Sequence, residues 1–197
     1  PRAKELAAII IEPLGGQSVT TEFLLFLRDF CDENNIVLIF DEVISGFRQS
    51  LTGAQSIFDV KPDLSCFGKA MGNGFPISAL VGRSDIMSEL DEAFFSFTFA
   101  GEIVGLFAAF KTMELIEERG TLQKINSFGE RFIHAIQEHI VLVEMDSCFN
   151  IGGPSFWPMF SFNDTGRNSP LELQTLFRQE LIRQSILTRP GLFFSGA

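Results

Sequence analysis

Short runs of apolar residues alternate with stretches of helical periodicity in the first part of the chain. Residues 6–11 and 36–40 are continuous apolar runs, which are typical of strands that are buried on both faces of a sheet. Between them, Thr20 and Thr21 are suited to cap a helix whose apolar residues recur at helical spacing through Asp32. A strand, a helix and a strand joined by short connections predict a crossover onto a parallel sheet.

The rest of the pattern predicts more strands and helices. Further strands are expected at residues 64–67, 77–81, 141–149 and 156–162. Further helices are expected at residues 101–118, 122–139 and 171–185. The first of these helices has an apolar face that includes Val104 and Phe107, and the last two strands belong to a separate antiparallel unit. This order predicts an α/β fold in two parts, at residues 1–124 and 125–197.

Composition excludes several classes of function. The formal net charge of −10 disfavours binding to nucleic acid or to an anionic membrane surface. No apolar stretch reaches the roughly 18 residues that a membrane-spanning helix needs. Three widely spaced cysteines indicate reduced thiols and a cytoplasmic location. Neither the cysteines nor His134 and His139 have a metal-binding spacing, so no metal site is expected.

The residue of greatest chemical interest is Lys69, which lies in a glycine-rich loop between Gly68 and Gly72. Asp41 precedes this loop at the end of the second apolar run, where α/β proteins place ligands. A lysine with an acid partner fits a Schiff-base site for a pyridinium cofactor, because the carboxylate keeps the ring nitrogen protonated and the ring then withdraws electrons. Taken singly, Lys69 also fits a solvated loop residue, and Asp41 a helix cap.

Four other side chains are candidates, each with an ordinary structural alternative. Val43 follows Asp41 by two residues and fits either against a flat aromatic ring or in the core. Thr98 stands before the long helix, where its hydroxyl suits a phosphate group or the helix N-terminus itself. Arg48 and Arg189 are each able to bind a carboxylate, although a surface ion pair is the commoner role of an arginine.

Taken together, these segments resemble the class III pyridoxal-phosphate aminotransferases, the family that includes glutamate-1-semialdehyde 2,1-aminomutase. The resemblance is carried by the motifs IIEP (10–13), LIFDEVISGFR (38–48), PDL (62–64), FGKAMGNGFPI (67–77), GR (82–83), TFAG (98–101) and RPG (189–191). The Asp-Glu-Val segment and the lysine loop, in this order and at this separation, are highly specific jointly. The match runs through nearly the whole chain.

The resemblance implies a fold, a cofactor and a set of roles. The fold is the type I fold of pyridoxal-phosphate enzymes, with part of the large mixed-sheet domain and part of the small C-terminal α+β domain. The cofactor is pyridoxal 5′-phosphate. Lys69 is implied as the catalytic residue that forms the Schiff base and moves the proton, Asp41 as the partner of the pyridine nitrogen, and Val43 as a contact of the ring. Glu12 lies near the site and is assigned no step.

The resemblance also implies partners. Thr98 reaches the cofactor phosphate of the other subunit in such a site, so a homodimer with a shared active site is expected. The substrate is a small amino acid, keto acid or semialdehyde, and the reaction is an aminotransfer or a 2,1-aminomutation. No nucleic-acid or membrane partner is expected.

Some positions depart from the family pattern. The Gly-Asn-Pro segment that usually follows the threonine is replaced, because Thr98 is followed by Phe-Ala-Gly-Glu. The polar residue of the loop after Pro13 has Gln17 as its nearest candidate. The chain also looks like the second half of such an enzyme, without the phosphate loop and the aromatic residue that stacks on the other face of the cofactor ring. This motivates an alternative, in which the chain is a truncated, catalytically silent paralogue or fragment that serves as an interaction subunit.

Overall fold

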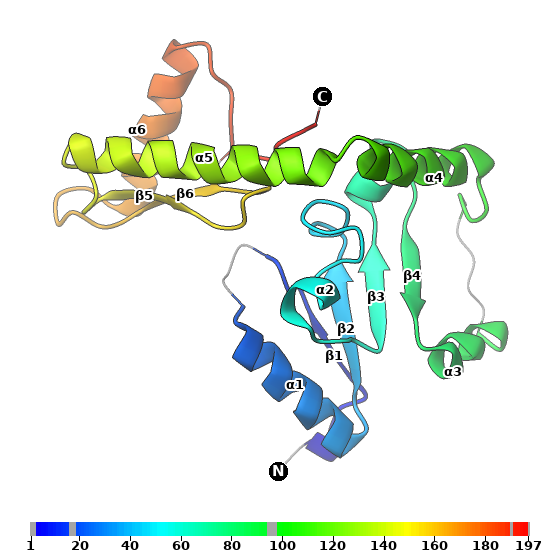
Figure 1. Cartoon of the computed structure of the whole chain (residues 1–197). Helices are drawn as coiled ribbons and strands as arrows, with labels where there is room; N and C mark the ends of the chain where they lie inside the picture. The colour runs from blue at the N-terminus through cyan, green and yellow to red at the C-terminus, as the bar shows by residue number, and fades with distance from the viewer. Residues whose placement is uncertain (1–2, 16–18, 94–97, 190, 197) are drawn as a thin grey trace. The chain divides into compact units, whose positions relative to one another are not determined.

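The computed structural model describes residues 3–15, 19–93, 98–189 and 191–196. They belong to two units, Pro1–Leu122 and Gln123–Ala197, shown together in Figure 1. No helix among the described residues is both long and apolar enough to cross a membrane. The described part of the chain likewise contains no cluster of three or more potential metal ligands.

The first unit is built on a four-stranded sheet with the order β1-β2-β3-β4. The strands are β1 (Ala8–Ile11), β2 (Val37–Glu42), β3 (Leu64–Phe67) and β4 (Ala79–Gly82). The pairs β1–β2 and β2–β3 are parallel, and β4 runs antiparallel to β3 (Figure 1). The expected strands and the parallel pairing are therefore confirmed, but the expectation that the first strand is buried on both faces is wrong, because Ile10 is 62% exposed. The second expected run differs in extent, because it continues through Asp41 and Glu42.

Helix α1 (Thr21–Asn34) joins β1 to β2 and has the predicted N-terminal cap. The Thr20 side chain accepts a hydrogen bond from the Phe23 N–H at 3.2 Å. The helix ends at Asn35, whose φ of 54° lies in the left-handed region that asparagine tolerates. Both ends of α1 are thus fixed by local sequence chemistry.

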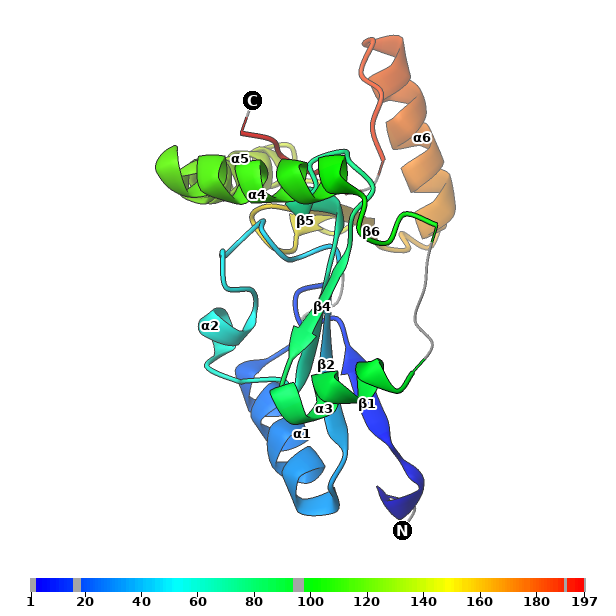
Figure 2. The same cartoon turned by 90° about the vertical axis from the view of Figure 1, so that its right-hand side faces the viewer.

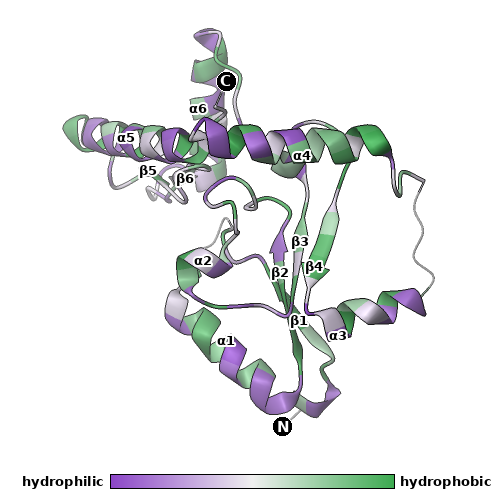
Figure 3. Cartoon of the chain, turned by 45° about the vertical axis from the view of Figure 1, so that its right-hand side comes forward, coloured by the Kyte–Doolittle hydropathy of each residue, from purple (hydrophilic) through white to green (hydrophobic). Residues whose placement is uncertain are grey.

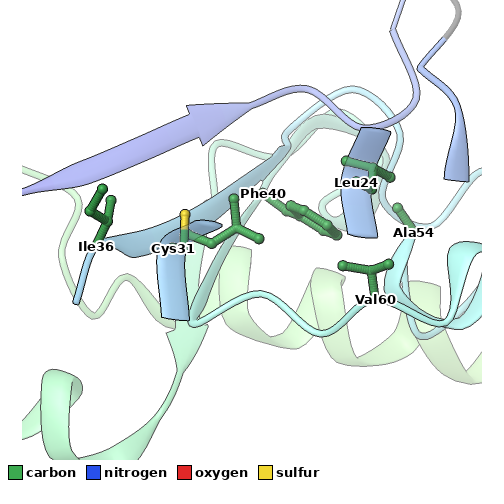
Figure 4. Packing of buried hydrophobic residues seen from close by; sticks show 7 residues of the cluster. Leu24, Cys31, Ile36, Phe40, Ala54 and Val60 are labelled. Atoms are coloured by element: carbon green, nitrogen blue, oxygen red, sulfur yellow. The ribbon is translucent and has the colours of Figure 1, made fainter. Parts of the chain in front are cut away.

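The core of this unit lies between α1 and one face of the sheet. Its buried residues come from α1, from β2 and from the segment around α2 (Gln55–Phe58): Leu24, Cys31, Ile36, Leu38, Phe40, Ala54 and Val60 (Figure 4). In a view turned by 90°, α1 and α2 lie on the same side of the sheet (Figure 2). Burial of these side chains holds β2 in place and leaves its other face free of this core.

Asp63 ties α1 to the sheet at the start of β3. Its carboxylate accepts the Leu38 N–H at 2.7 Å and bonds to Arg28 at 3.0 Å and Arg83 at 2.8 Å. Burial alone raises the pKa of Asp63, but these donors more than offset it and hold the pKa below its ordinary value. Asp63 therefore joins α1, β2 and the segment after β4 through one ionised group.

Helix α4 (Ile103–Glu118) packs on the first unit through small residues. Its buried residues are Gly105 and Ala109, whereas Val104 is 56% exposed and Phe107 is 67% exposed. The predicted apolar face of this helix is therefore wrong. The first half of the helix is almost entirely apolar, whereas its second half also carries charged residues (Figure 3), so periodicity did not distinguish the face that allows close approach.

Among the described residues of the first unit there remain three 3-10 helices and one short α-helix. They are η1 (Ala3–Glu5), η2 (Lys69–Met71), η3 (Ser88–Asp91) and α3 (Ser84–Met87). Each spans no more than four residues, which is too short to give a periodic signal in the sequence.

The second unit contains α5 (Thr121–Leu142), a hairpin of β5 (Phe149–Gly152) and β6 (Met159–Phe162), and α6 (Pro170–Arg183). The antiparallel pairing is confirmed, and α6 begins with the expected proline after the Ser169 cap. The strand expected at 141–149 is wrong, because α5 continues to Leu142 and β5 begins only at Phe149. The core is rich in phenylalanine: Phe149, Phe160, Phe162 and Phe177 pack ring against ring.

Candidate active site

The candidate site lies where three parallel strands end side by side. Ile11 pairs with Phe40, and Asp41 pairs with Cys66. Extending the first register by one residue places Glu12 beside Asp41, and Lys69 follows two residues after the end of β3. The carboxyl ends of parallel strands are where open α/β sheets bind ligands. The topology therefore brings an amine and two carboxyl groups to one edge.

Asp41 is half-buried on the face of the sheet opposite the core. Burial alternates along β2, with Phe40 and Glu42 buried on the core side. The Asp41 carboxylate accepts the Val43 N–H at 3.1 Å. The chain turns after Glu42, and the Val43 side chain lies beside Gly68, where an added Cβ would be 3.5 Å from Val43 Cγ1. The Val43 side chain thus lies beside the turn that contains Lys69, although the backbone at Val43 is itself turned and not extended.

Glu42 fixes the turn that follows Asp41. Its side chain is 1% exposed and accepts the Ala54 N–H at 2.8 Å and the Ser45 hydroxyl at 3.3 Å. Burial raises the pKa of Glu42, and these two donors offset only part of that effect. A buried carboxyl group therefore supports the segment that carries Asp41 and Val43, although the motif gave no indication of this.

Lys69 begins a tight turn in a conformation that is unusual for its residue type. Its φ is 42°, in the left-handed region, and its carbonyl accepts the Gly72 and Asn73 N–H groups. Met71 anchors the turn in a small core with Phe67. The Lys69 residue itself is exposed. The hydrogen-bonded turn, anchored by Met71, therefore holds the backbone of an exposed lysine side chain.

The glycines of the lysine loop serve the loop itself more than a ligand. A Cβ on Gly72 would lie 2.5 Å from the Phe75 carbonyl oxygen and 2.6 Å from Ile77. Gly74 has a φ of 103°, which favours glycine, and open space around it. Close packing within the loop therefore explains the glycine at position 72.

The charges at this edge affect one another. Burial raises the pKa of the Glu12 carboxyl, the negative charge of Asp41 raises it further, and the positive charge of Lys69 lowers it. Burial also raises the pKa of the Cys66 thiol, and Asp41 adds to this. Glu12 is thus within electrostatic reach of both Asp41 and Lys69. The resemblance placed Glu12 near the site without a step, and the strand register places it beside Asp41.

The other candidate residues lie elsewhere or remain untested. Thr98 is exposed in the turn before α4, and its implied role toward a second subunit stays a prediction. The helix N-terminus near it is already capped, because Glu102 accepts the Val104 N–H at 2.8 Å and the Gly105 N–H at 2.6 Å. Thr98 is therefore not the cap, and these two N–H groups are not free for a phosphate.

Two arginines and one glutamine complete the set of candidates. Arg48 is half-buried, and burial lowers its pKa, so it does not have the surface position expected of it. Arg189 lines a cavity of about 350 Å³ in the second unit together with Arg178. Gln17 lies outside the described residues.

Comparison with known proteins identifies the family. The family model "Aminotransferase class-III" matches residues 2–142, which is more than half of the chain. The chain belongs to the class III aminotransferase family. The α/β arrangement of a mixed sheet followed by a smaller α+β unit is accordingly that of the type I fold.

Among curated members of this family, two relatives carry different names. A 3-aminobutyryl-CoA aminotransferase from Cloacimonas acidaminovorans is 36% identical over 94% of the chain and 46% of the relative. A glutamate-1-semialdehyde 2,1-aminomutase from Francisella philomiragia is 40% identical over 98% of the chain and 48% of the relative. The chain thus spans about half the length of the curated class III relatives that it matches.

Solved structures agree with this assignment. An omega-transaminase from Sphaerobacter thermophilus superposes with a TM-score of 0.85 at 28% identity, covering 99% of the chain and 48% of the transaminase. A transaminase with PLP bound superposes with a TM-score of 0.89 at 23% identity, over 99% of the chain and 48% of that protein. The second likeness concerns the fold alone.

Proposed function

We propose that the whole protein transfers an amino group on a small amino or keto acid with pyridoxal 5′-phosphate as its cofactor. The observation that carries this proposal is the lysine at the sheet edge: Lys69 is held at a φ of 42°, near the ends of the strands that carry Glu12 and Asp41. A left-handed conformation is unfavourable for a residue with a Cβ, by about 1–2 kcal/mol relative to the right-handed one. Glycine would be the cheaper choice at this position, so the side chain itself is the reason for a lysine there.

The described residues suit this cofactor. An exposed primary amine is able to link covalently to an aldehyde, a half-buried carboxylate is able to pair with a ring nitrogen, and an aliphatic side chain is able to cover a flat ring. Lys69, Asp41 and Val43 supply these three groups along one edge of the sheet. When bound, the cofactor supplies an electron sink for the substrate carbon.

Each residue then has a distinct task. The Asp41 carboxylate, which accepts the Val43 N–H, would pair with the ring nitrogen. Val43 packs on one face of the ring. Lys69 would hold the cofactor covalently through its Nζ atom, and as a free amine it would take up and return a proton at that atom. We assign Thr98 to the cofactor phosphate of a second subunit, which makes the active unit a homodimer.

The proposed substrate class includes amino acids, keto acids and semialdehydes. The two relatives described above are named as an aminomutase and as an aminotransferase of a CoA thioester. Both kinds of reaction need the same lysine and acid, so these residues do not separate them. We place the protein in the cytoplasm on the basis of its unpaired cysteines. The alternative of a silent interaction subunit has no specific observation in its favour.

The test is covalent trapping of the cofactor in the whole protein. The protein is incubated with pyridoxal 5′-phosphate, reduced with borohydride and digested, and the labelled peptide is mapped by mass spectrometry. We expect the label on Lys69 and its loss in Lys69→Arg, which keeps the positive charge. A label on another lysine, or none, would contradict the proposal. Conversion of the bound cofactor to its amine form by a panel of amino acids then selects the substrate.

A further inference from the structure

The lysine loop contains the pair Asn73–Gly74, to which the proposed function gives no role. It is the only Asn-Gly pair in the sequence. Asn73 has a φ of 47° and Gly74 a φ of 103°, so both residues lie at positive φ. Glycine and asparagine adopt such conformations more readily than other residues, so the shape of the turn favours both of them. The turn therefore places a side-chain amide directly before a glycine.

The two groups of this pair that are able to react with each other are not held by hydrogen bonds. Both residues are exposed, and no described residue bonds to the Asn73 side-chain amide or to the Gly74 N–H. By contrast, the Asn73 N–H donates to the Lys69 carbonyl at 3.1 Å and the Phe75 N–H to the Gly72 carbonyl at 3.1 Å. A Cβ on Gly74 would meet no atom of the described chain within 4 Å, so this residue has room to rotate.

An asparagine side chain in this situation is open to attack by the next backbone nitrogen. The bond from the Gly74 nitrogen to Asn73 Cγ forms, the bond from Cγ to the side-chain nitrogen breaks, and the proton of the Gly74 N–H leaves with ammonia. Water then opens the cyclic imide at one of its two carbonyl groups. One product is aspartate, and the other is isoaspartate, whose main chain runs through Cβ and Cγ and is one atom longer. Nothing is oxidised or reduced.

We propose that Asn73 and Gly74 form a site of spontaneous deamidation whose isoaspartyl product loosens the turn that carries Lys69. The hydrogen bond from the Phe75 N–H to the Gly72 carbonyl closes over residues 73 and 74, so a longer main chain between them disrupts its geometry. Both products add a carboxylate to the loop, but only isoaspartate changes the main chain. The reaction needs no cofactor, whereas its effect on cofactor attachment rests on the proposed function.

The first experiment follows the reaction in the cofactor-free whole protein. Samples aged at mildly alkaline pH are digested, and mass spectrometry with isoaspartyl methyltransferase labelling identifies the products. We expect Asn73 to convert at a rate of the same order as in a synthetic peptide of the loop. Asn34 and Asn163 are internal controls that should stay intact, because their side chains donate to the Phe30 and Ser147 carbonyls. An intact Asn73 in the protein, with conversion in the peptide, would overturn the inference.

Two variants separate the added charge from the longer main chain. Asn73→Gly suits the positive φ and has no amide, so its loop should not change on ageing. Asn73→Asp reproduces the aspartyl product and should keep the amide hydrogen exchange of the fresh wild-type loop. In aged wild-type protein the Phe75 amide should exchange faster, because its bond to the Gly72 carbonyl is lost. Unchanged exchange in molecules that contain isoaspartate contradicts the proposed loosening. Circular dichroism verifies that each sample is folded.

Borohydride trapping with pyridoxal 5′-phosphate measures the consequence for Lys69. We expect the label on Lys69 to fall in step with the isoaspartyl fraction as the wild-type protein ages, and to stay constant in Asn73→Gly. Full labelling of molecules that contain isoaspartate defeats this inference and leaves the proposed function intact. If fresh protein is not labelled at Lys69, the proposed function fails, and the conversion of Asn73 and the exchange of the Phe75 amide still decide the inference.

Discussion

A single backbone conformation distinguishes Lys69 from an ordinary loop lysine. Its φ is 42°, a backbone conformation that is unfavourable for every residue with a Cβ and that only glycine adopts readily. We expect Lys69→Gly to be more stable than Lys69→Ala by about 1 kcal/mol, although both lose covalent cofactor attachment. Chemical denaturation of the two cofactor-free variants measures the difference. Ala70→Gly, in the same turn without a positive φ, should instead destabilise the protein by about 0.5–1 kcal/mol.

Glu42 offers a second prediction for a single residue. Its folded pKa is raised by burial, so its contribution to stability is fully present below the unfolded pKa and is lost as pH rises through the folded pKa. Glu42→Gln resembles the neutral form. The stability of this variant relative to the wild type should therefore improve as pH rises from acid to neutral. Denaturation midpoints at a series of pH values measure this, and a constant difference would contradict it.

The control for this prediction is Glu42→Ala. It removes the acceptor of the Ala54 N–H and leaves a cavity beside Gly53, so it should cost roughly 2–4 kcal/mol at acid pH, where Glu42 is neutral in the wild type. The loss in free energy of unfolding should change with pH as it does in Glu42→Gln, because both variants lack the ionisable group. The additional loss, which is the same at each pH, then measures the lost hydrogen bond and packing.

At the scale of an element, the start of α4 depends on an unusual cap. Glu102 accepts two N–H groups of the first turn and places a negative charge at the positive end of the helix dipole. Glu102→Ala should destabilise the protein by about 1 kcal/mol, and Glu102→Asn should recover most of that loss, because asparagine is a good cap. Thermal denaturation measures both. Glu117→Ala, near the other end of the helix, should be neutral or slightly stabilising.

The junction of α1 with the sheet depends on Asp63. Its folded pKa is lowered, so its stabilisation is present above the unfolded pKa and is lost as pH falls through the folded pKa. Asp63→Asn should cost roughly 2–3 kcal/mol at pH 7, because Arg28 loses its buried partner. The penalty should shrink toward pH 3, which denaturation at both pH values would show. A penalty that is independent of pH would contradict the ionised role.

The sequence predicts an element well where its pattern of apolar residues fits only a few structures. The strands of the sheet were predictable because continuous apolar runs with short connections fit few other structures. Residues 141–149 were misread, since Val141 and Leu142 look like a strand yet end α5 with 65% and 77% exposure. The position of Glu12 beside Asp41 depends on register between strands, which no single-chain pattern encodes.

For the whole molecule, the shared active site that we propose has a quantitative consequence. If Lys69 of one subunit works with Thr98 of the other, Lys69→Ala and Thr98→Ala subunits complement each other. A mixed dimer then has one intact site and one doubly defective site. With random pairing after denaturation and refolding together, about a quarter of the sites are restored. Aminotransfer assays on the mixture should therefore exceed the average of the two separate variants, whereas sites contained within one subunit would give only that average.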